Sequence, residues 1–157
     1  MNFLFLCTGN SCRSILSEAI FNARAPEGFS ACSAGSKPTG KVHPLTLKTL
    51  QNLGISTQGL SSKTMQDCER FNPQVVINVC GSAAAEPCPL YLGKAIKTHW
   101  GLEDPSHLEV SEDEKMQAFM QTVEHINRRF DAFFALDLTH LSPEKLITEI
   151  NKISEIA

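Results

Sequence analysis

The chain is predicted to fold as an α/β protein, a three-layer sandwich in which helices flank a four-stranded parallel sheet. Short apolar runs alternate with amphipathic helical segments along its 157 residues, as parallel sheets require. The length fits one domain, residues 1–157, with a large core. In such sheets the ligand lies beyond the carboxyl ends of the strands. Functional residues are therefore expected where the strands end, directly after Leu6, Ser33, Val79 and His99.

The chain opens with a strand, a helix and a second strand. Residues 2–7 are a short apolar run suited to a strand buried on both faces. Residues 13–25 carry apolar side chains at helical spacing, and Pro26 and Gly28 end this helix. Residues 29–33 form a weaker strand pattern, which completes the first strand–helix–strand unit.

Two helical segments and the strongest strand pattern follow. Residues 43–53 read as a helix, with Pro44 near its start and Gly54 as its C-cap. Residues 62–70 predict a further short helix. Residues 74–80 are rich in valine and isoleucine, which favours a buried central strand.

The rest of the chain adds one strand and two helices. Residues 95–100 predict the fourth strand. Ser111 and Glu114 form a capping-box pattern that opens a long amphipathic helix. Ser142, followed by proline, opens the last helix. The part from about residue 131 onward is interpreted as a C-terminal helical extension that packs on the domain and takes no part in chemistry.

Composition excludes several functional classes. The net charge is −3 and no basic run exceeds two residues, so a nucleic-acid partner is not expected. The apolar run at residues 3–6 is too short to span a membrane and has no signal-peptide flanks. A cytoplasmic location is expected, where the six cysteines would be free thiols, metal ligands or redox groups.

Residues 7–14, Cys-Thr-Gly-Asn-Ser-Cys-Arg-Ser, lie between the first predicted strand and helix. Their backbone N–H groups, at a helix N-terminus, would form a concave anion site. Gly9 and Asn10 tolerate the left-handed backbone angles of such a loop. Arg13 and the helix dipole would favour the thiolate of Cys7. The expected substrate-binding residues are Thr8, Gly9, Asn10, Ser11, Cys12, Arg13 and Ser14. The alternative is a buried cysteine before an ordinary helix start.

The later part of the chain supplies three side chains whose chemistry suits such a site: Cys80, Cys88 and Asp104. Cys80 ends the third strand at the active edge of the sheet, and Cys88 follows in a loop of small residues. Asp104 precedes Pro105, which holds its carboxyl group in a rigid turn where it could act as a general acid. The alternatives are core or bystander cysteines and a common Asp-Pro turn. Zinc is disfavoured, because the cysteine spacings do not match the usual ligand pairs.

Residues 7–14 resemble the signature loop of the low-molecular-weight tyrosine phosphatase superfamily. That superfamily includes phosphatases and a branch of arsenate reductases, and its fold is flavodoxin-like. Phosphatases hydrolyse a cysteinyl-phosphate with water, whereas reductases need a second thiol to attack the sulfur of a cysteinyl-arsenate. With Cys80, Cys88 and Asp104 added, the chain is similar to the thiol-relay arsenate reductases of bacteria.

This resemblance implies a relay without metal or organic cofactor. Cys7 would attack arsenate held by the loop and Arg13, with Asp104 as acid. Cys80 would then attack the adduct and release arsenite, and Cys88 would take over the disulfide from Cys80. Thioredoxin is the expected reductant, with glutathione and glutaredoxin as alternatives, and the protein is expected to be a monomer. Phosphate or sulfate could bind the same loop.

Two other functions stay open. A tyrosine phosphatase would hydrolyse phosphoesters through a phosphocysteine at Cys7 and would need only Arg13 and Asp104 besides. A non-enzymatic oxyanion-binding or redox-sensing module would bind anions without turnover.

Some residues depart from the family pattern or are expected to be structural. Some relatives bind potassium beneath the loop; Asn10, Glu18 and Ser33 match that site, but Lys63 stands where an aspartate is needed. The lysine would replace the ion, so no potassium site is expected. The three remaining cysteines have no expected role in electron transfer. Cys12 is expected to support the loop, Cys32 to be a core thiol and Cys68 to be an incidental helix residue.

Overall fold

A computed structural model describes residues 1–80, 93–107 and 110–156. Its centre is a sheet of four strands, all parallel, in the order β2-β1-β3-β4. The strands are β1 (Asn2–Cys7), β2 (Ser30–Gly35), β3 (Val75–Asn78) and β4 (Ile96–His99). The predicted four-stranded parallel sheet is thus confirmed.

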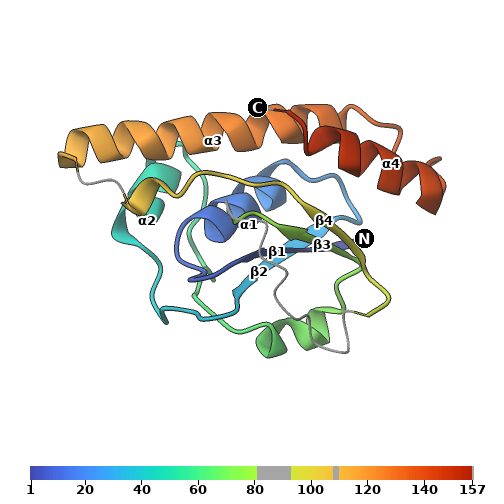
Figure 1. The fold of residues 1–157 in the computed structure, drawn as a ribbon, viewed down its shortest axis with the longest axis horizontal. Helices are drawn as coiled ribbons and strands as arrows, with labels where there is room; N and C mark the ends of the chain where they lie inside the picture. Colours follow the sequence, from blue (N-terminus) through green and yellow to red (C-terminus); the bar gives the residue numbers. More distant parts are fainter. Residues whose placement is uncertain (81–92, 108–109, 157) are drawn as a thin grey trace.

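Helices cover one face of the sheet (Figure 1). They are α1 (Arg13–Arg24), α2 (Pro44–Asn52), α3 (Glu112–Phe134) and α4 (Pro143–Ile153). The predicted caps are present: the Ser111 side chain accepts a hydrogen bond from the N–H of Glu114, and Ser142 accepts one from Lys145. The predicted short helix at 62–70 is instead a 3-10 helix, η1 (Gln66–Phe71), on the opposite face of the sheet.

The two faces of the sheet bury different side chains, because successive residues of a strand point to opposite sides. Phe3 and Phe5 of β1 face the helices, where they pack with Phe21 of α1. Leu4 faces the other way, together with Val76 of β3, and packs beneath η1. The sheet is therefore buried on both faces, which explains the continuous apolar composition of β1.

α3 and α4 form the outermost part of the helical layer. α3 runs unbroken past residue 131, and α4 packs against both α3 and β4. The indole N–H of Trp100 donates a hydrogen bond to the carbonyl of Ile150 in α4, at 3.0 Å. The division into a domain and an extension from about residue 131 stays a prediction, but α4 covers part of the core.

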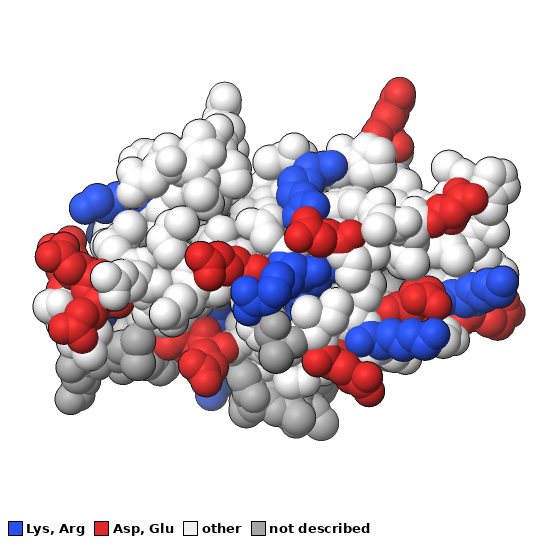
Figure 2. Space-filling view, turned by 90° about the horizontal axis from the view of Figure 1, so that it is seen from above, with Lys and Arg blue, Asp and Glu red and all other residues white. Residues whose placement is uncertain are grey.

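The face formed by α3 and α4 carries mixed charge (Figure 2). Acidic side chains gather where α3 begins, since its first turn holds Glu112, Asp113 and Glu114. Basic and acidic groups alternate over the rest of this face. Among the helices in the described part of the chain, none is long and apolar enough to cross a membrane.

Candidate active site

The loop after β1 lies at the carboxyl edge of the sheet and continues directly into α1. Its carbonyl oxygens are bound by neighbouring backbone: Lys37 donates to Thr8 at 2.9 Å and Thr39 donates to Gly9 at 3.0 Å. Gly35 supports the loop by close approach, because a Cβ at this position would lie 2.6 Å from the carbonyl oxygen of Thr8. These contacts fix the loop and occupy carbonyls that would otherwise repel an anion.

The left-handed backbone that we expected at two loop positions occurs at one of them. Asn10 has a φ of 46°, whereas Gly9 is not among the residues with positive φ. The prediction for Gly9 was therefore wrong. A side chain there would be limited by space instead, since a Cβ would lie 3.2 Å from Cγ2 of Thr39.

Cys7 ends β1 with its side chain buried, 5% exposed. Its sulfur accepts a hydrogen bond from the backbone N–H of Asn10 at 3.2 Å and lies 2.9 Å from Oγ of Ser14. Ser14 was expected to bind substrate, and the structure places it against the sulfur of Cys7.

A buried polar network decides which way the Ser14 hydroxyl points. Oδ1 of Asn10 accepts from the N–H of Lys63 at 2.8 Å, so its Nδ2 must be the group that faces Ser14 and Ser33. Nδ2 donates to Ser14 at 2.8 Å, which leaves the hydroxyl proton of Ser14 free to point at Cys7. Two donors thus converge on the sulfur, an arrangement that stabilises a thiolate.

Arg13 and Asp104 form an ion pair beside the loop, 3.4 Å between Nη2 and Oδ2. Nη1 of Arg13 also donates to the carbonyl of Leu102 at 3.2 Å. Nε of Arg13 is buried, and the described residues offer it no hydrogen-bond partner. A planar guanidinium with an unused donor is suited to bind a tetrahedral oxyanion.

The carboxyl group of Asp104 is held by several donors. Oδ1 accepts from the backbone N–H of Ser106 at 2.9 Å and from its hydroxyl at 2.6 Å. Ser106 was not predicted, although an aspartate in a turn often accepts a hydrogen bond from the backbone N–H two residues further on. These hydrogen bonds fix Asp104 at the edge of the loop. From the sequence, its carboxyl group was expected to act there as a general acid.

Cys12 connects the loop to Asp104. Its thiol is 3% exposed and donates to Oδ1 of Asp104 at 3.4 Å. Burial, followed by the charges of Asp104 and Cys7, raises the pKa of Cys12 to about 12. Cys12 is therefore a neutral thiol at physiological pH and not a second nucleophile.

Cys80 lies next to the loop, as its place after β3 predicted. Its sulfur is 3.5 Å from the hydroxyl oxygen of Thr8, and its carbonyl oxygen is 2.5 Å from Nε2 of His99. His99 positions the backbone of Cys80, a role that sequence reasoning did not assign to it. Cys88 lies outside the described residues.

The site expected to be free of potassium holds a charged side chain. Ser33 donates to Oε1 of Glu18 at 2.8 Å, and Nζ of Lys63 lies 3.5 Å from the same oxygen. The ammonium group thus faces the carboxylate beneath the loop. Within the described ranges, no group of three or more His, Cys, Asp or Glu side chains is placed to hold a metal ion.

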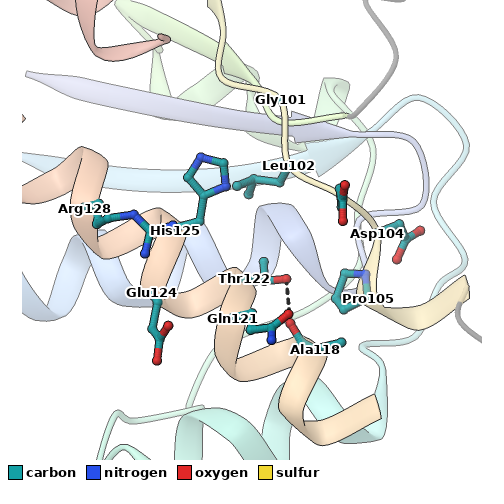
Figure 3. A pocket seen from close by; sticks show the side chains of 11 residues that line it. Gly101, Leu102, Asp104, Pro105, Ala118, Gln121, Thr122, Glu124, His125 and Arg128 are labelled. Atoms are coloured by element: carbon teal, nitrogen blue, oxygen red, sulfur yellow. Dashed lines mark hydrogen bonds between the residues drawn. The ribbon is translucent and has the colours of Figure 1, made fainter. Parts of the chain in front are cut away.

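A pocket of about 460 Å³ lies between residues 101–105 and α3 (Figure 3). His125 and Arg128 of α3 face it across from Leu102. Burial lowers the pKa of His125, whose Nε2 lies 2.9 Å from the carbonyl oxygen of Ile156. Asp104 borders this pocket as well as the loop, so the pocket adjoins the candidate acid.

Comparison with known proteins gives consistent matches. The model of the low molecular weight phosphotyrosine protein phosphatase family matches residues 2–146. An arsenate reductase of Bacillus licheniformis is 33% identical over 129 residues, 82% of this chain and 91% of the relative. An arsenate reductase of Bacillus subtilis is 31% identical over the same coverage. A solved arsenate reductase in its phosphate-binding state has 26% identity and a TM-score of 0.64, covering 81% of this chain and 94% of the other.

Proposed function

The chain belongs to the low molecular weight phosphotyrosine protein phosphatase family, and on this basis we propose that it reduces arsenate to arsenite. Its curated relatives are arsenate reductases at 31–33% identity over most of both chains. The observation that carries the proposal within the molecule is the position of Cys80 beside the loop that begins at Cys7. Hydrolysis of a phosphocysteine has no use for a second thiol there.

The first step binds and attacks the oxyanion. Arsenate occupies the loop of residues 8–14 and takes hydrogen bonds from the loop N–H groups and from Arg13. The thiolate of Cys7 forms a bond to arsenic, and one arsenic–oxygen bond breaks. Asp104, which takes up a proton from solvent once the oxyanion has replaced it at Arg13, supplies that proton so that this oxygen leaves as water.

The second step transfers the electrons. The thiolate of Cys80 attacks the sulfur of Cys7, the sulfur–arsenic bond breaks, and arsenite leaves with the two electrons of that bond. Cys88 then attacks Cys80 and sets Cys7 free. The Cys80–Cys88 disulfide is reduced by the dithiol of thioredoxin, which restores the resting enzyme.

Cys7, Arg13, Cys80, Cys88 and Asp104 are therefore the proposed catalytic residues. The enzyme is proposed to act in the cytoplasm as a monomer without cofactor. The elution volume in size-exclusion chromatography would test the monomer, and full turnover in metal-free buffer would test the absence of a metal cofactor. Phosphate and sulfate should compete with arsenate for the loop.

The test measures arsenite release and phosphoester hydrolysis side by side, with and without thioredoxin. We expect thioredoxin-driven arsenite release that vanishes in Cys7→Ser, Cys80→Ser and Cys88→Ser. The disulfide present after one turnover should join Cys80 to Cys88. Full multi-turnover reduction by Cys80→Ser and Cys88→Ser would contradict the relay.

The family match favours a second activity, hydrolysis of phosphoesters through a phosphocysteine at Cys7. Cys80→Ser separates the two reactions, because it should stop arsenate turnover and spare hydrolysis. Strong hydrolysis without any arsenite release would make the phosphatase the main function.

A further inference from the structure

A pair of thiols lies outside the proposed relay, on the sheet face opposite the helices. Cys32 of β2 and Cys68 of η1 have their sulfur atoms 2.8 Å apart, and both are free thiols. A disulfide bond measures about 2.05 Å, so the two atoms need to approach by only about 0.8 Å to be joined. Cys68, which was expected to be an incidental helix residue, is buried at 1% exposure although its neighbours in the sequence are polar.

The two thiols differ in environment. Cys68 is enclosed by the small cluster around Leu4 and Val76, and its sulfur lies 3.5 Å from the carbonyl oxygen of Ser33. Cys32 is only partly buried and can be reached from solvent. The hydrogen bond from Cys68, followed by the charge of Lys63, lowers the pKa of Cys32, whereas the same hydrogen bond and burial raise the pKa of Cys68.

We propose that Cys32 and Cys68 are a second redox site, which hydrogen peroxide converts to an intramolecular disulfide. The accessible Cys32 attacks the peroxide oxygen, so the O–O bond breaks and water and a sulfenic acid form. The thiol of Cys68 then attacks the sulfur of Cys32 and expels a second water. Two thiols lose two electrons and two protons, and one hydrogen peroxide becomes two waters.

The bond would join β2 to η1, which closely follows residues 62 and 63. These two residues support the loop after β1 that is proposed to bind the oxyanion. In this segment Ser62 donates to the carbonyl of Gly9 at 3.1 Å, and the N–H of Lys63 donates to Asn10 at 2.8 Å. Oxidation would therefore covalently restrain the segment that supports the loop after β1. None of the cysteines of the proposed relay would take part.

The experiment treats the full chain with hydrogen peroxide, blocks remaining thiols under denaturing conditions and maps disulfides by mass spectrometry. We expect a Cys32–Cys68 peptide that forms before either residue reaches the sulfinic state. In Cys68→Ala, which deletes the resolving thiol, Cys32 should advance to sulfenic and sulfinic acid. Oxidised protein with Cys32 and Cys68 still alkylatable, or paired with other cysteines, would overturn the proposal.

A second measurement compares melting temperatures. The disulfide would close the loop of chain between Cys32 and Cys68. This should raise the midpoint of thermal unfolding by about 5 °C or more in oxidised protein. Cys32→Ser removes the nucleophile. The rise in its melting temperature on oxidation should therefore be smaller than the rise in the wild type by about 5 °C or more. An equal rise in Cys32→Ser would count against the site. Reduced Cys32→Ser should keep thioredoxin-driven arsenate turnover, so failure of the relay and failure of this redox site are separable.

Discussion

At the scale of single residues, Asn10 sets the geometry of the site. It is fully buried, it supplies the positive φ of the loop, and its amide group fixes the hydroxyls of Ser14 and Ser33. An aspartate could adopt the same backbone angles, but its carboxylate could donate to neither serine. The amide and not the backbone preference is therefore what this position requires.

Ser14→Ala tests the hydrogen bond to Cys7. A hydrogen bond to a charged group is worth about 1.5–3 kcal/mol, so alkylation of Cys7 at neutral pH should slow by roughly tenfold or more. The measurement follows the Cys7 peptide by mass spectrometry. Ser17→Ala is the matched control: Ser17 is buried on the same helix, but its hydroxyl binds the carbonyl of Arg13. Equal rates in both variants would rule out a special role for Ser14.

Cys12 should make the protein sensitive to alkali. Its pKa of about 12 in the folded state lies above the ordinary value of 9.0. Folding therefore gains from the neutral thiol below pH 9, and this gain is lost as the pH rises through about 12. Between about pH 8 and pH 10, the wild type should lose about 1 kcal/mol more stability than Cys12→Ala. Chemical denaturation of both proteins across this range measures it, and parallel curves would contradict it.

At the scale of elements, short segments outside the helices and strands hold the site together. The 62–71 segment shows this best. The sequence predicted a short helix from 62 to 70, and η1 covers only its second half. Residues 62–64 instead run along the carboxyl end of β2, where Thr64 bridges to Gly35 and the backbone of Lys63 binds Asn10. No local pattern encodes this position, because it depends on partners about 30–50 residues away in the chain.

The ion pair of Lys63 and Glu18 should matter for stability. Both side chains are largely buried, at 19% and 10% exposure. Lys63→Met leaves the carboxylate of Glu18 without its cation, which should cost about 2 kcal/mol. The double variant Lys63→Met/Glu18→Gln should recover most of this loss, because a neutral amide needs no counter-charge. Urea denaturation of the wild type, Lys63→Met, Glu18→Gln and the double variant gives the coupling energy, and purely additive effects would show that the pair does not stabilise the fold.

At the scale of the whole molecule, strand order explains why Cys80 lies beside the loop that begins at Cys7. β1 lies at the centre of the sheet, between β2 and β3. The carboxyl ends of parallel neighbours share one edge, so the residues after β1 and β3 are adjacent although more than 70 positions separate them. The sequence predicted from two strand patterns alone that Cys80 lies beside the loop that begins at Cys7, and the contact of Cys80 with Thr8 confirms this. It could not predict which side chains orient them, because the roles of Ser14 and His99 arise from rotamers and contacts across elements.

α4 should stabilise the core through its buried face. Ile150 is fully buried and its carbonyl accepts the indole hydrogen bond of Trp100, whereas Ile147 on the same helix is 40% exposed. Ile150→Ala should cost about 2–4 kcal/mol and Ile147→Ala well under 1 kcal/mol. Thermal unfolding followed by the fluorescence of Trp100, the single tryptophan, measures both. Similar costs for the two variants would show that α4 is peripheral to the fold.

The ion pair between Arg13 and Asp104 also has a consequence for selectivity among anions. The guanidinium that an oxyanion must recruit is already neutralised by a carboxylate of the protein, so binding is an exchange of partners and not the capture of a vacant cation. A weakly charged or loosely fitting anion gains too little to displace Asp104. The carboxylate therefore acts as an internal competitor, which should keep chloride and other monovalent anions of the cell from blocking the loop.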